Sequence, residues 1–342
     1  MSTPTTTDLP RVTVNQLAYN RRDQLAEALE HLHRLDYPAD KLEFVVVDNA
    51  SSDGTSEMLA ERFGDVRVER QEVNEGVPGW NHGFRAGTGE WFLVLDDDCY
   101  VEGDALRRAL VAAEEEGADL VSFGVRSHSR PDYRFDQEYR LGLIGFWGCA
   151  VLIHRRVIEA LGGYDPEIFL WAHEAEFMLR VLDRGFRHLH LPEIVAVHIK
   201  DVPYEGEIPA RTLLFNAEHL AYIAARRLQT RDAVVASANV LLNSLSVALK
   251  RADVRGTILQ QTVAGIRRGA RLHEPVRPEV SSLYRRHFHE FLFPLRWMRS
   301  PLRMLSDRRA GRSFQKDLRV RQQRFWDARP DVYPSGRGSL KV

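Results

Sequence analysis

The first two hundred residues alternate strand-like and helix-like segments, and this alternation limits the fold more than any other feature of the chain. The predicted strands are apolar runs bounded by turn residues, and they cover 12–17, 43–47, 66–69, 91–95 and 120–125. The predicted helices lie between them and cover 23–35, 55–63 and 103–116, with a helix or loop at 79–86. This order predicts an α/β fold with a mostly parallel sheet and helices on both faces.

The length of 342 residues suggests two structural units. Residues 201–284 carry helical patterns without an internal repeat, and the residues after them mix arginine, aromatics and proline. We therefore predict a disordered N-terminus over 1–10, an α/β domain over 11–200 and a helical, basic C-terminal region over 201–342.

The composition is that of a folded soluble chain, with 44% hydrophobic and 28% charged residues. The start lacks an apolar run, so we expect no signal peptide. Residues 233–249 contain no charge but include serine and asparagine, and we expect a buried helix there rather than a membrane span. The two cysteines, Cys99 and Cys149, fit a reducing compartment, so we expect a cytoplasmic protein.

The net charge of −1 hides an asymmetry along the chain. Residues 285–342 carry 15 Lys and Arg against 5 Asp and Glu, while the remainder carries 32 against 43. The acidic remainder disfavours a nucleic-acid partner. Two hypotheses stay open for the arginine- and aromatic-rich stretch 285–305: it docks on an anionic membrane surface, or it packs on the acidic remainder or a second subunit.

Two predicted strands end in carboxylates, FVVVD at Asp48 and FLVLDDD at Asp96–Asp98. Ligands of such sheets bind beyond the carboxyl ends of the strands. On an extended backbone Asp96 and Asp98 share a face while Asp97 points away, so the first and third can address one ion. Magnesium suits one or two carboxylates completed by substrate phosphates. A solvated acidic turn is the alternative.

Three competing sites fit the sequence less well. A dinucleotide oxidoreductase needs a glycine-rich turn after the first strand, where LAYNRR stands. An aspartyl phosphatase usually has threonine or valine after its second aspartate, where this chain has Cys99. A zinc site would use histidines whose spacing matches no common zinc motif: His173, His188, His190 and His198.

The predicted helix after Trp171 carries two glutamates at its start. Glu174 lies three and four residues before Phe177 and Met178, which places it on the apolar, inward face. Glu176 is expected on a solvated side, near Arg180. A carboxylate on an inward face near a helix start is either structural or catalytic.

Four blocks in this order resemble family-2 glycosyltransferases with the GT-A fold, over about residues 11–200. They are VTVNQLAYNRRDQLAEALEHL, FVVVDNASSDGT, NEGVPGWNHGFRAGTGEWFLVLDDD and GCAVLIHRRVIEALGGYDPEIFLWAHEAEFMLRVLDRG. The chain departs from the family pattern at Ala18, at Trp80, and at His173–Glu176, where HEAE replaces the usual E-D-x-D.

The resemblance implies an inverting, nucleotide-sugar-dependent transferase of the hexosyltransferase type. Glu174 aligns with the catalytic base of the family, and Asp96, Asp98 and His198 with ligands of Mn²⁺ or Mg²⁺. The residues expected to contact or shape the nucleotide site are Asn20, Asp48, Asp53, Asn81, Asp96 and Asp97. The donor expected is a UDP- or dTDP-sugar, and the acceptor a hydroxyl of a glycan, lipid-linked glycan or small molecule. A nucleotide-sugar-binding protein without transfer activity and a nucleotidyltransferase remain the alternatives.

Overall fold

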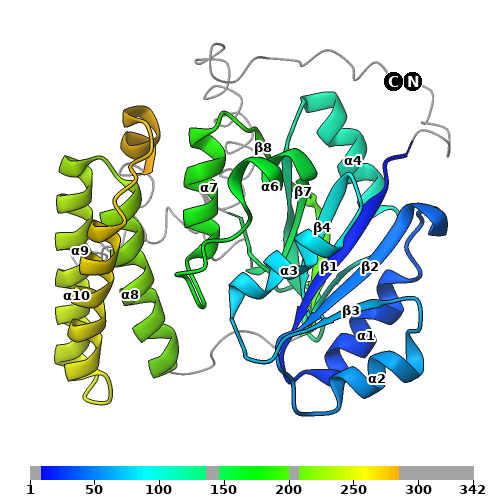
Figure 1. Ribbon diagram of the computed structural model, residues 1–342, viewed down its shortest axis with the longest axis horizontal. Coiled ribbons are helices and arrows are strands. Elements are labelled where there is room, and N and C mark those ends of the chain that lie inside the picture. The colour runs from blue at the N-terminus through cyan, green and yellow to red at the C-terminus, as the bar shows by residue number, and fades with distance from the viewer. Residues whose placement is uncertain (1–8, 136–145, 200–207, 285–342) are drawn as a thin grey trace.

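The computed structural model describes residues 9–135, 146–199 and 208–284. Figure 1 shows two parts side by side, a sheet covered by helices and a bundle of long helices. Within the described residues the strands form one eight-stranded sheet in the order β3-β2-β1-β4-β7-β6-β8-β5. Leu9 is already buried against the first part, so the fold begins inside the predicted disordered N-terminus.

Four parallel strands form the first half of the sheet, and they are β1 (Val12–Ala18), β2 (Leu42–Asp48), β3 (Arg67–Arg70) and β4 (Trp91–Asp96). Ala18 lies opposite Asp48, and Leu17 lies opposite Asp96. The carboxyl ends of β1, β2 and β4 therefore meet at one edge of the sheet. This edge carries both carboxylate motifs that the sequence analysis singled out.

The second half of the sheet is mixed, with β7 (Ala150–His154) antiparallel to both β4 and β6 (Leu120–Ser127). Strand β8 (His188–His198) runs parallel to β6, and the short β5 (Cys99–Val101) runs antiparallel to β8. Four of the seven pairings are parallel, so the mostly parallel prediction holds by a narrow margin. The β5–β8 pairing places His198 opposite Cys99.

Helices cover both faces of the sheet, as predicted. On one face lie α1 (Arg22–Leu32), α2 (Thr55–Arg62) and α4 (Ala105–Glu116), whose Leu29, Leu59 and Leu106 share one buried core. On the other face lie α3 (Trp80–Ala86), α6 (Arg155–Leu161) and α7 (His173–Asp183) around a second core. Short 3-10 turns, η2 (Ala39–Lys41) and η3 (Val77–Gly79), precede β2 and α3.

The C-terminal region is helical over the residues that the structure describes, in agreement with the sequence. It forms a bundle of α8 (Ala210–Arg227), α9 (Thr230–Lys250) and α10 (Arg255–Arg271). Helix α10 packs closely on α8 because Gly265 lacks a side chain, and a Cβ there would lie 2.2 Å from the carbonyl oxygen of Glu218. Tyr222 and Ile223 of α8 enter the same core as α7, so the bundle and the sheet share one hydrophobic interior.

Glu176 corrects one expectation, because it is fully buried rather than solvated. Its carboxylate accepts from Arg180 one turn along α7 and from Arg227 of α8, each at 2.6–2.8 Å through the closest nitrogen. The prediction failed because a helix distant in the sequence covers this side of α7. Burial would raise the pKa of Glu176, but the two guanidinium groups outweigh it and lower that pKa.

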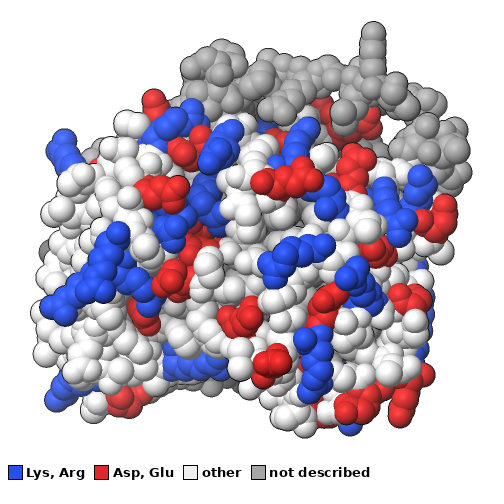
Figure 2. Space-filling view, in the orientation of Figure 1, with Lys and Arg blue, Asp and Glu red and all other residues white. Residues whose placement is uncertain are grey.

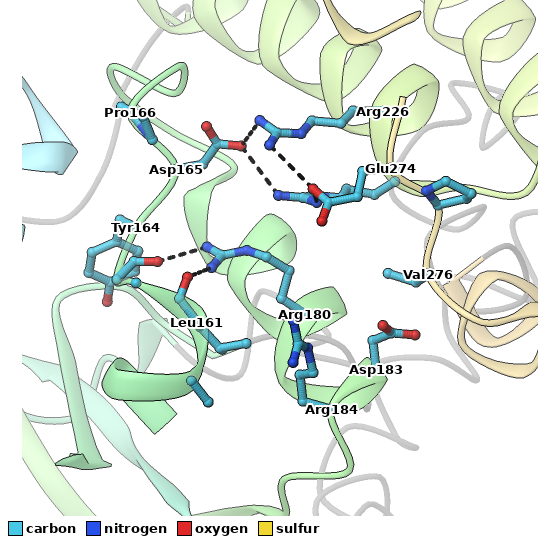
Figure 3. Close-up of a pocket in the computed structure, with 15 residues that line it drawn as sticks. Leu161, Tyr164, Asp165, Pro166, Arg180, Asp183, Arg184, Arg226, Glu274 and Val276 are labelled. Atoms are coloured by element: carbon cyan, nitrogen blue, oxygen red, sulfur yellow. Dashed lines mark hydrogen bonds and ion pairs between the residues drawn. The ribbon is translucent and has the colours of Figure 1, made fainter. Parts of the chain in front are cut away.

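A charged cavity of about 300 Å³ lies at this junction, between the turn after α6, the end of α7 and the bundle. Figure 3 shows Asp165 facing Arg226 across it, and Arg180 reaching back to the loop that holds Tyr164. The walls mix arginines with carboxylates that pair with them. We therefore interpret the cavity as part of the junction that joins bundle and sheet.

Helix α9 corrects a second expectation. Among the described residues it is the one helix long and apolar enough to cross a membrane by length and composition, and 28% of its most apolar window is buried. The predicted buried helix is thus largely exposed along one side. Val234, Leu242 and Leu249 are 65%, 60% and 73% exposed.

The Glu176 ion pairs generate a stability prediction. Glu176→Gln should lower the free energy of unfolding by about 3 kcal/mol at pH 7, because two buried guanidinium groups lose their shared counter-charge. Since the folded-state pKa of Glu176 lies below its unfolded value, this contribution is present above about pH 4.5 and is lost as the pH falls through the folded-state pKa. Denaturant unfolding of the variant and the wild type at pH 7 and pH 3.5 would measure the difference.

Glu159→Gln is the matched control, because Glu159 is an exposed glutamate on the neighbouring helix α6. It should leave the unfolding free energy unchanged within about 0.5 kcal/mol. Equal unfolding free energies for Glu176→Gln and Glu159→Gln at pH 7 would contradict the assignment.

Candidate active site

Three consecutive aspartates occupy the edge where β4 ends. The strand stops at Asp96, and Asp97 and Asp98 form a tight turn into β5. The predicted extended backbone is present at Asp96 but not at Asp97 and Asp98, which are turn residues. The turn nevertheless separates their side chains, because Asp97 contacts the end of β1 while Asp98 also approaches β8.

Asp96, Asp98 and His198 converge on one point. Each offers one ligand atom, and these three atoms lie within 4.8 Å of one another. His198 Nε2 is 3.5 Å from Asp98 Oδ1, a buried oxygen that accepts no hydrogen bond from the described residues. Two carboxylate oxygens and one imidazole nitrogen form a donor set that suits Mn²⁺ or Mg²⁺. The residues present therefore fit the ion that the sequence resemblance implies.

Arg21 and Tyr19, just after β1, hold the other aspartate. The backbone N–H of Tyr19 donates to Asp97 Oδ2 at 2.9 Å, and Arg21 donates to Asp97 Oδ1 at 3.0 Å. The same guanidinium donates to Asp98 Oδ2 at 2.5 Å. Asp97 thus fixes the turn after β1 against the turn after β4, and sequence reasoning had assigned no role to Arg21.

The cluster carries an excess of negative charge. Burial raises the pKa of Asp97 to about 7, although the positive charge of Arg21 acts to lower it. Burial, followed by the charges of Asp98 and Asp97, raises the pKa of Asp96 well above its ordinary value. A divalent cation would relieve this repulsion, because opposite charge nearby favours the ionised carboxylates.

Glu174 lies in the first turn of α7 on the same side of the sheet, and its charge contributes to the raised pKa of Asp96. The side chain is 23% exposed and lies 3.4 Å from Nδ1 of His173. A Cβ on Gly148 would lie 2.4 Å from Glu174 Oε1 and 2.8 Å from His173 Nε2, so both side chains require glycine there. The sequence had not singled out Gly148.

The backbone before Glu174 is strained. Trp171 and Ala172 have φ angles of 67° and 61°, in the left-handed region that costs non-glycine residues about 1–3 kcal/mol each. The Trp171 indole nitrogen and both ring nitrogens of His173 are buried without a hydrogen-bond partner among the described residues. Such strain persists only where the surroundings fix it, so α7 presents Glu174 from a rigidly held turn.

Three residues that the sequence predicts near the nucleotide, Asn20, Asp48 and Asp53, form hydrogen bonds within and between the loops after β1 and β2. The Asp48 carboxylate is buried and accepts from the backbone of Ser51 at 2.8 Å, from Arg70 at 2.7 Å and from the Ser56 hydroxyl. The Asn20 side chain accepts from the Ser52 backbone at 2.8 Å. Asp48 therefore organises its own loop through partners, Ser56 and Arg70, that the sequence analysis did not name.

Asp53 begins the turn into α2 and accepts from Thr55 and from the backbone of Arg22. Burial would raise the pKa of Asp53, but these hydrogen bonds outweigh it and lower that pKa. Asn81 lies apart from this loop. Its amide donates to the carbonyl of Tyr164 at 2.9 Å and accepts from the backbone N–H of Tyr164 at 2.8 Å, so it ties α3 to the turn after α6.

Residues 17–170 match the sequence profile of Glycosyl transferase family 2. This segment of the chain belongs to that family. The resemblance stated from the four sequence blocks is thereby confirmed over the matched residues.

Curated relatives match parts of the chain. The succinoglycan biosynthesis protein ExoO of Rhizobium meliloti is 36% identical over 123 residues, which cover 35% of this chain and 34% of that protein. The poly(ribitol-phosphate) beta-N-acetylglucosaminyltransferase TarS of Staphylococcus aureus is 29% identical over 127 residues, or 35% of this chain and 22% of that protein. The chain therefore spans about a fifth to a third of the length of these two relatives.

Solved structures show the same fold over most of the chain. The mannosyltransferase PcManGT from Pyrobaculum calidifontis, in complex with GDP-Man and Mn²⁺, gives a TM-score of 0.54 at 23% identity and covers 93% of this chain and 89% of that one. TarS 1–349 of Staphylococcus aureus in complex with UDP-GlcNAc gives 0.52 at 16% identity, over 93% and 92%. These likenesses confirm the predicted GT-A fold.

The carboxylate cluster generates a metal-binding prediction. Mn²⁺ should raise the melting temperature of the wild type, because a ligand at a hundredfold excess over its Kd adds about 2.7 kcal/mol. Asp98→Asn and Asp96→Asn should lose this shift, while Asp97→Asn should keep most of it, since Asp97 lies outside the converging atoms. Thermal melts with Mn²⁺ and with EDTA measure the shift. A shift lost only in Asp97→Asn would show that the ion is held elsewhere.

Proposed function

We propose that this chain is an inverting, metal-dependent glycosyltransferase that moves a sugar from a nucleoside diphosphate sugar to a hydroxyl acceptor. The observation that carries the proposal is the Asp96, Asp98 and His198 cluster at the carboxyl edge of a family-2 domain, with Glu174 close by. Glu174 packs on Gly148, and the carbonyl of the next residue, Cys149, accepts from the backbone N–H of Asp96 at 3.1 Å. A base on one side and a metal-ligand set on the other suit a displacement at an anomeric carbon between them.

Glu174 takes the proton of the acceptor hydroxyl as that oxygen attacks the sugar. Base catalysis of this kind contributes about 10²–10⁴-fold to a rate. The helix N-terminus and the strained turn before Glu174 fix its direction, which matters because attack requires an aligned geometry. A single displacement inverts the anomeric configuration.

Asp96, Asp98 and His198 would hold Mn²⁺ or Mg²⁺, which when bound neutralises charge on the diphosphate leaving group. Arg21 supports this geometry, because its guanidinium holds the outer oxygen of Asp98 and leaves the other oxygen, Oδ1, toward His198. Asp97 carries the hydrogen bonds that lock the turn, and so it positions its two neighbours.

The donor occupies the edge formed by the loops after β1, β2 and β4. Asn20, Asp48 and Asp53 shape the nucleoside side of this pocket through the loop 49–54. Asn81 acts apart from this loop, by tying α3 to the turn after α6. A UDP- or dTDP-sugar is the donor that we favour from the sequence resemblance. The complexes of PcManGT with GDP-Man and of TarS with UDP-GlcNAc support the class of donor and leave the base open.

The acceptor class is a hydroxyl of a glycan, a lipid-linked glycan or a small molecule, and the reaction takes place in the cytoplasm. The named relatives act in poly(ribitol-phosphate) glycosylation and succinoglycan biosynthesis, which supports a carbohydrate acceptor. Release of a nucleoside diphosphate, rather than pyrophosphate, distinguishes this function from that of a nucleotidyltransferase.

Glu174→Gln tests the base. The amide keeps the size of the side chain but cannot accept the proton, so kcat should fall at least about 10²-fold while the Kd for the nucleoside diphosphate stays unchanged. Coupled detection of the released diphosphate and calorimetry measure the two quantities. Glu159→Gln is the matched control on α6 and should behave as wild type. Wild-type turnover in Glu174→Gln would remove Glu174 from the mechanism.

Gly148→Ala tests how the base is positioned. The new methyl would lie 2.4 Å from Glu174 Oε1, the flexible end of that side chain, and 2.8 Å from Nε2 of the buried His173, so both side chains must move. A displacement of about 1 Å can cost about 10²-fold in rate, so we expect kcat to fall about tenfold or more while the variant still unfolds cooperatively. Gly64→Ala is the control, because nothing lies within 4 Å of its Cβ position. Equal turnover in the two variants would contradict the tight packing of Glu174 on Gly148.

A further inference from the structure

Helix α9 presents its large apolar residues outward. We define the outer face of α9 as the exposed side chains of six residues: Val234, Val235, Leu241, Leu242, Leu245 and Leu249. They lie at helical spacing on one side of the helix over residues 234–249, with the exposed Ala238 in the gap between Val235 and Leu241, so they form a stripe about 22 Å long. A stripe of this kind is uncommon on a monomeric soluble surface and marks a contact with something apolar.

The opposite face of α9 is small and polar, although it is the buried one. Asp232, Asn239 and Ser244 lie inside the bundle with four alanine or valine residues. Ser244 bonds Thr262 of α10 at 2.8 Å, and Asp232 accepts from Ser281 at 2.7 Å. Helix α9 is therefore inverted relative to an ordinary surface helix, whose larger apolar residues face the protein core.

The charges around the outer face narrow the choice of partner. Arg231 and Lys250 are exposed at its two ends, with no charged residue between them on that face. Residues 208–284 carry 11 Lys and Arg against 5 Asp and Glu, whereas residues 1–207 carry 21 against 38. Figure 2 shows Lys and Arg side chains over the bundle, at the left of the view. The apolar stripe thus lies on the basic part of the described chain.

We propose that the outer face of α9 docks on the surface of an anionic phospholipid bilayer, with the helix lying in the plane of the interface. Aliphatic side chains enter the boundary between headgroups and acyl chains, and Arg231 and Lys250 contact lipid phosphates at the two ends. This docking does not depend on the proposed sugar transfer.

The geometry favours lying on the bilayer over crossing it. Helix α9 is held to α8 and α10 along its polar face, and a spanning orientation would expose Asp232, Asn239 and Ser244 to hydrocarbon. At the surface of a bilayer the apolar face can contact the acyl chains while the polar face keeps its contacts with α8 and α10.

A second copy of the chain fits the outer face less well. A parallel pairing of two α9 helices brings Arg231 near Arg231, and an antiparallel pairing brings Arg231 near Lys250. Both arrangements place like charges together on a region that already carries excess positive charge, whereas an anionic bilayer supplies the opposite charge.

The test uses the full chain with a probe on the outer face. Leu245→Cys takes a polarity-sensitive fluorophore, because native Cys99 and Cys149 are both buried. The control is Val73→Cys, an exposed apolar position on the other part of the molecule that is more accessible than Leu245 (64% exposed against 45%). With vesicles of phosphatidylcholine and phosphatidylglycerol, the probe at 245 should shift to the blue and be quenched by a nitroxide lipid. The probe at 73 should not change, and salt or pure phosphatidylcholine should weaken the response.

A second arm removes the stripe. Leu241→Ser, Leu242→Ser and Leu245→Ser together should lower the vesicle-bound fraction of unlabelled protein about tenfold or more, with an unchanged melting temperature. Three results overturn the proposal. If the protein sediments with vesicles while the probe at 245 stays in water, another part of the chain docks. If a lipid-independent dimer buries this probe, the outer face mediates self-association, and if the triple variant melts lower and never binds vesicles, the chain itself covers this face.

Discussion

Mutual repulsion among Asp96, Asp97 and Asp98 is the constraint on which the rest of the site depends. Burial makes this repulsion expensive, and Arg21 compensates only part of it, through Asp97 and Asp98. The three carboxylates lie together because they are consecutive residues at the end of β4, and Tyr19 and Arg21 reach them because β1 and β4 end at the same level. A bound cation would relieve this repulsion, which is the physical basis of the metal site that we propose.

The second consequence of that arrangement concerns His198. It lies a hundred residues after Asp98 in the sequence, yet the antiparallel pairing of β5 and β8 brings it to the same point. A three-residue strand thus determines the geometry of the cluster, because Cys99 both follows Asp98 and pairs with His198. Buried Cys99 and Cys149 fill the space beneath the turn, so the apolar core supports the aspartates from inside the sheet.

Much of this fold follows from local sequence patterns, and two of the wrong predictions, for Glu176 and for α9, have a common cause. The strand and helix bounds of the first half agree with prediction to within about three residues, because apolar periodicity there reflects burial against one sheet. Glu176 and α9 were misjudged because their surroundings come from helices distant in the sequence: Arg227 covers the first, and α8 and α10 take the polar face of the second. Strand ends and helical phase indicated Asp96, Asp98 and Glu174 as candidates, whereas Arg21, Gly148 and Arg70 act through contacts that only the folded chain defines.

The Glu176 ion pairs also bear on how the molecule can be divided. Arg227 lies in the bundle and Glu176 in the helix that carries Glu174, while Tyr222 and Ile223 of the bundle complete the core under that same helix. The sequence pattern therefore changes from α/β to helical near residue 200, but one hydrophobic core continues across this point. A chain cut there would leave α7 with one uncovered apolar side and a carboxylate that retains only Arg180. The bundle thus completes the hydrophobic interior under α7, and we expect both parts to unfold together as one unit.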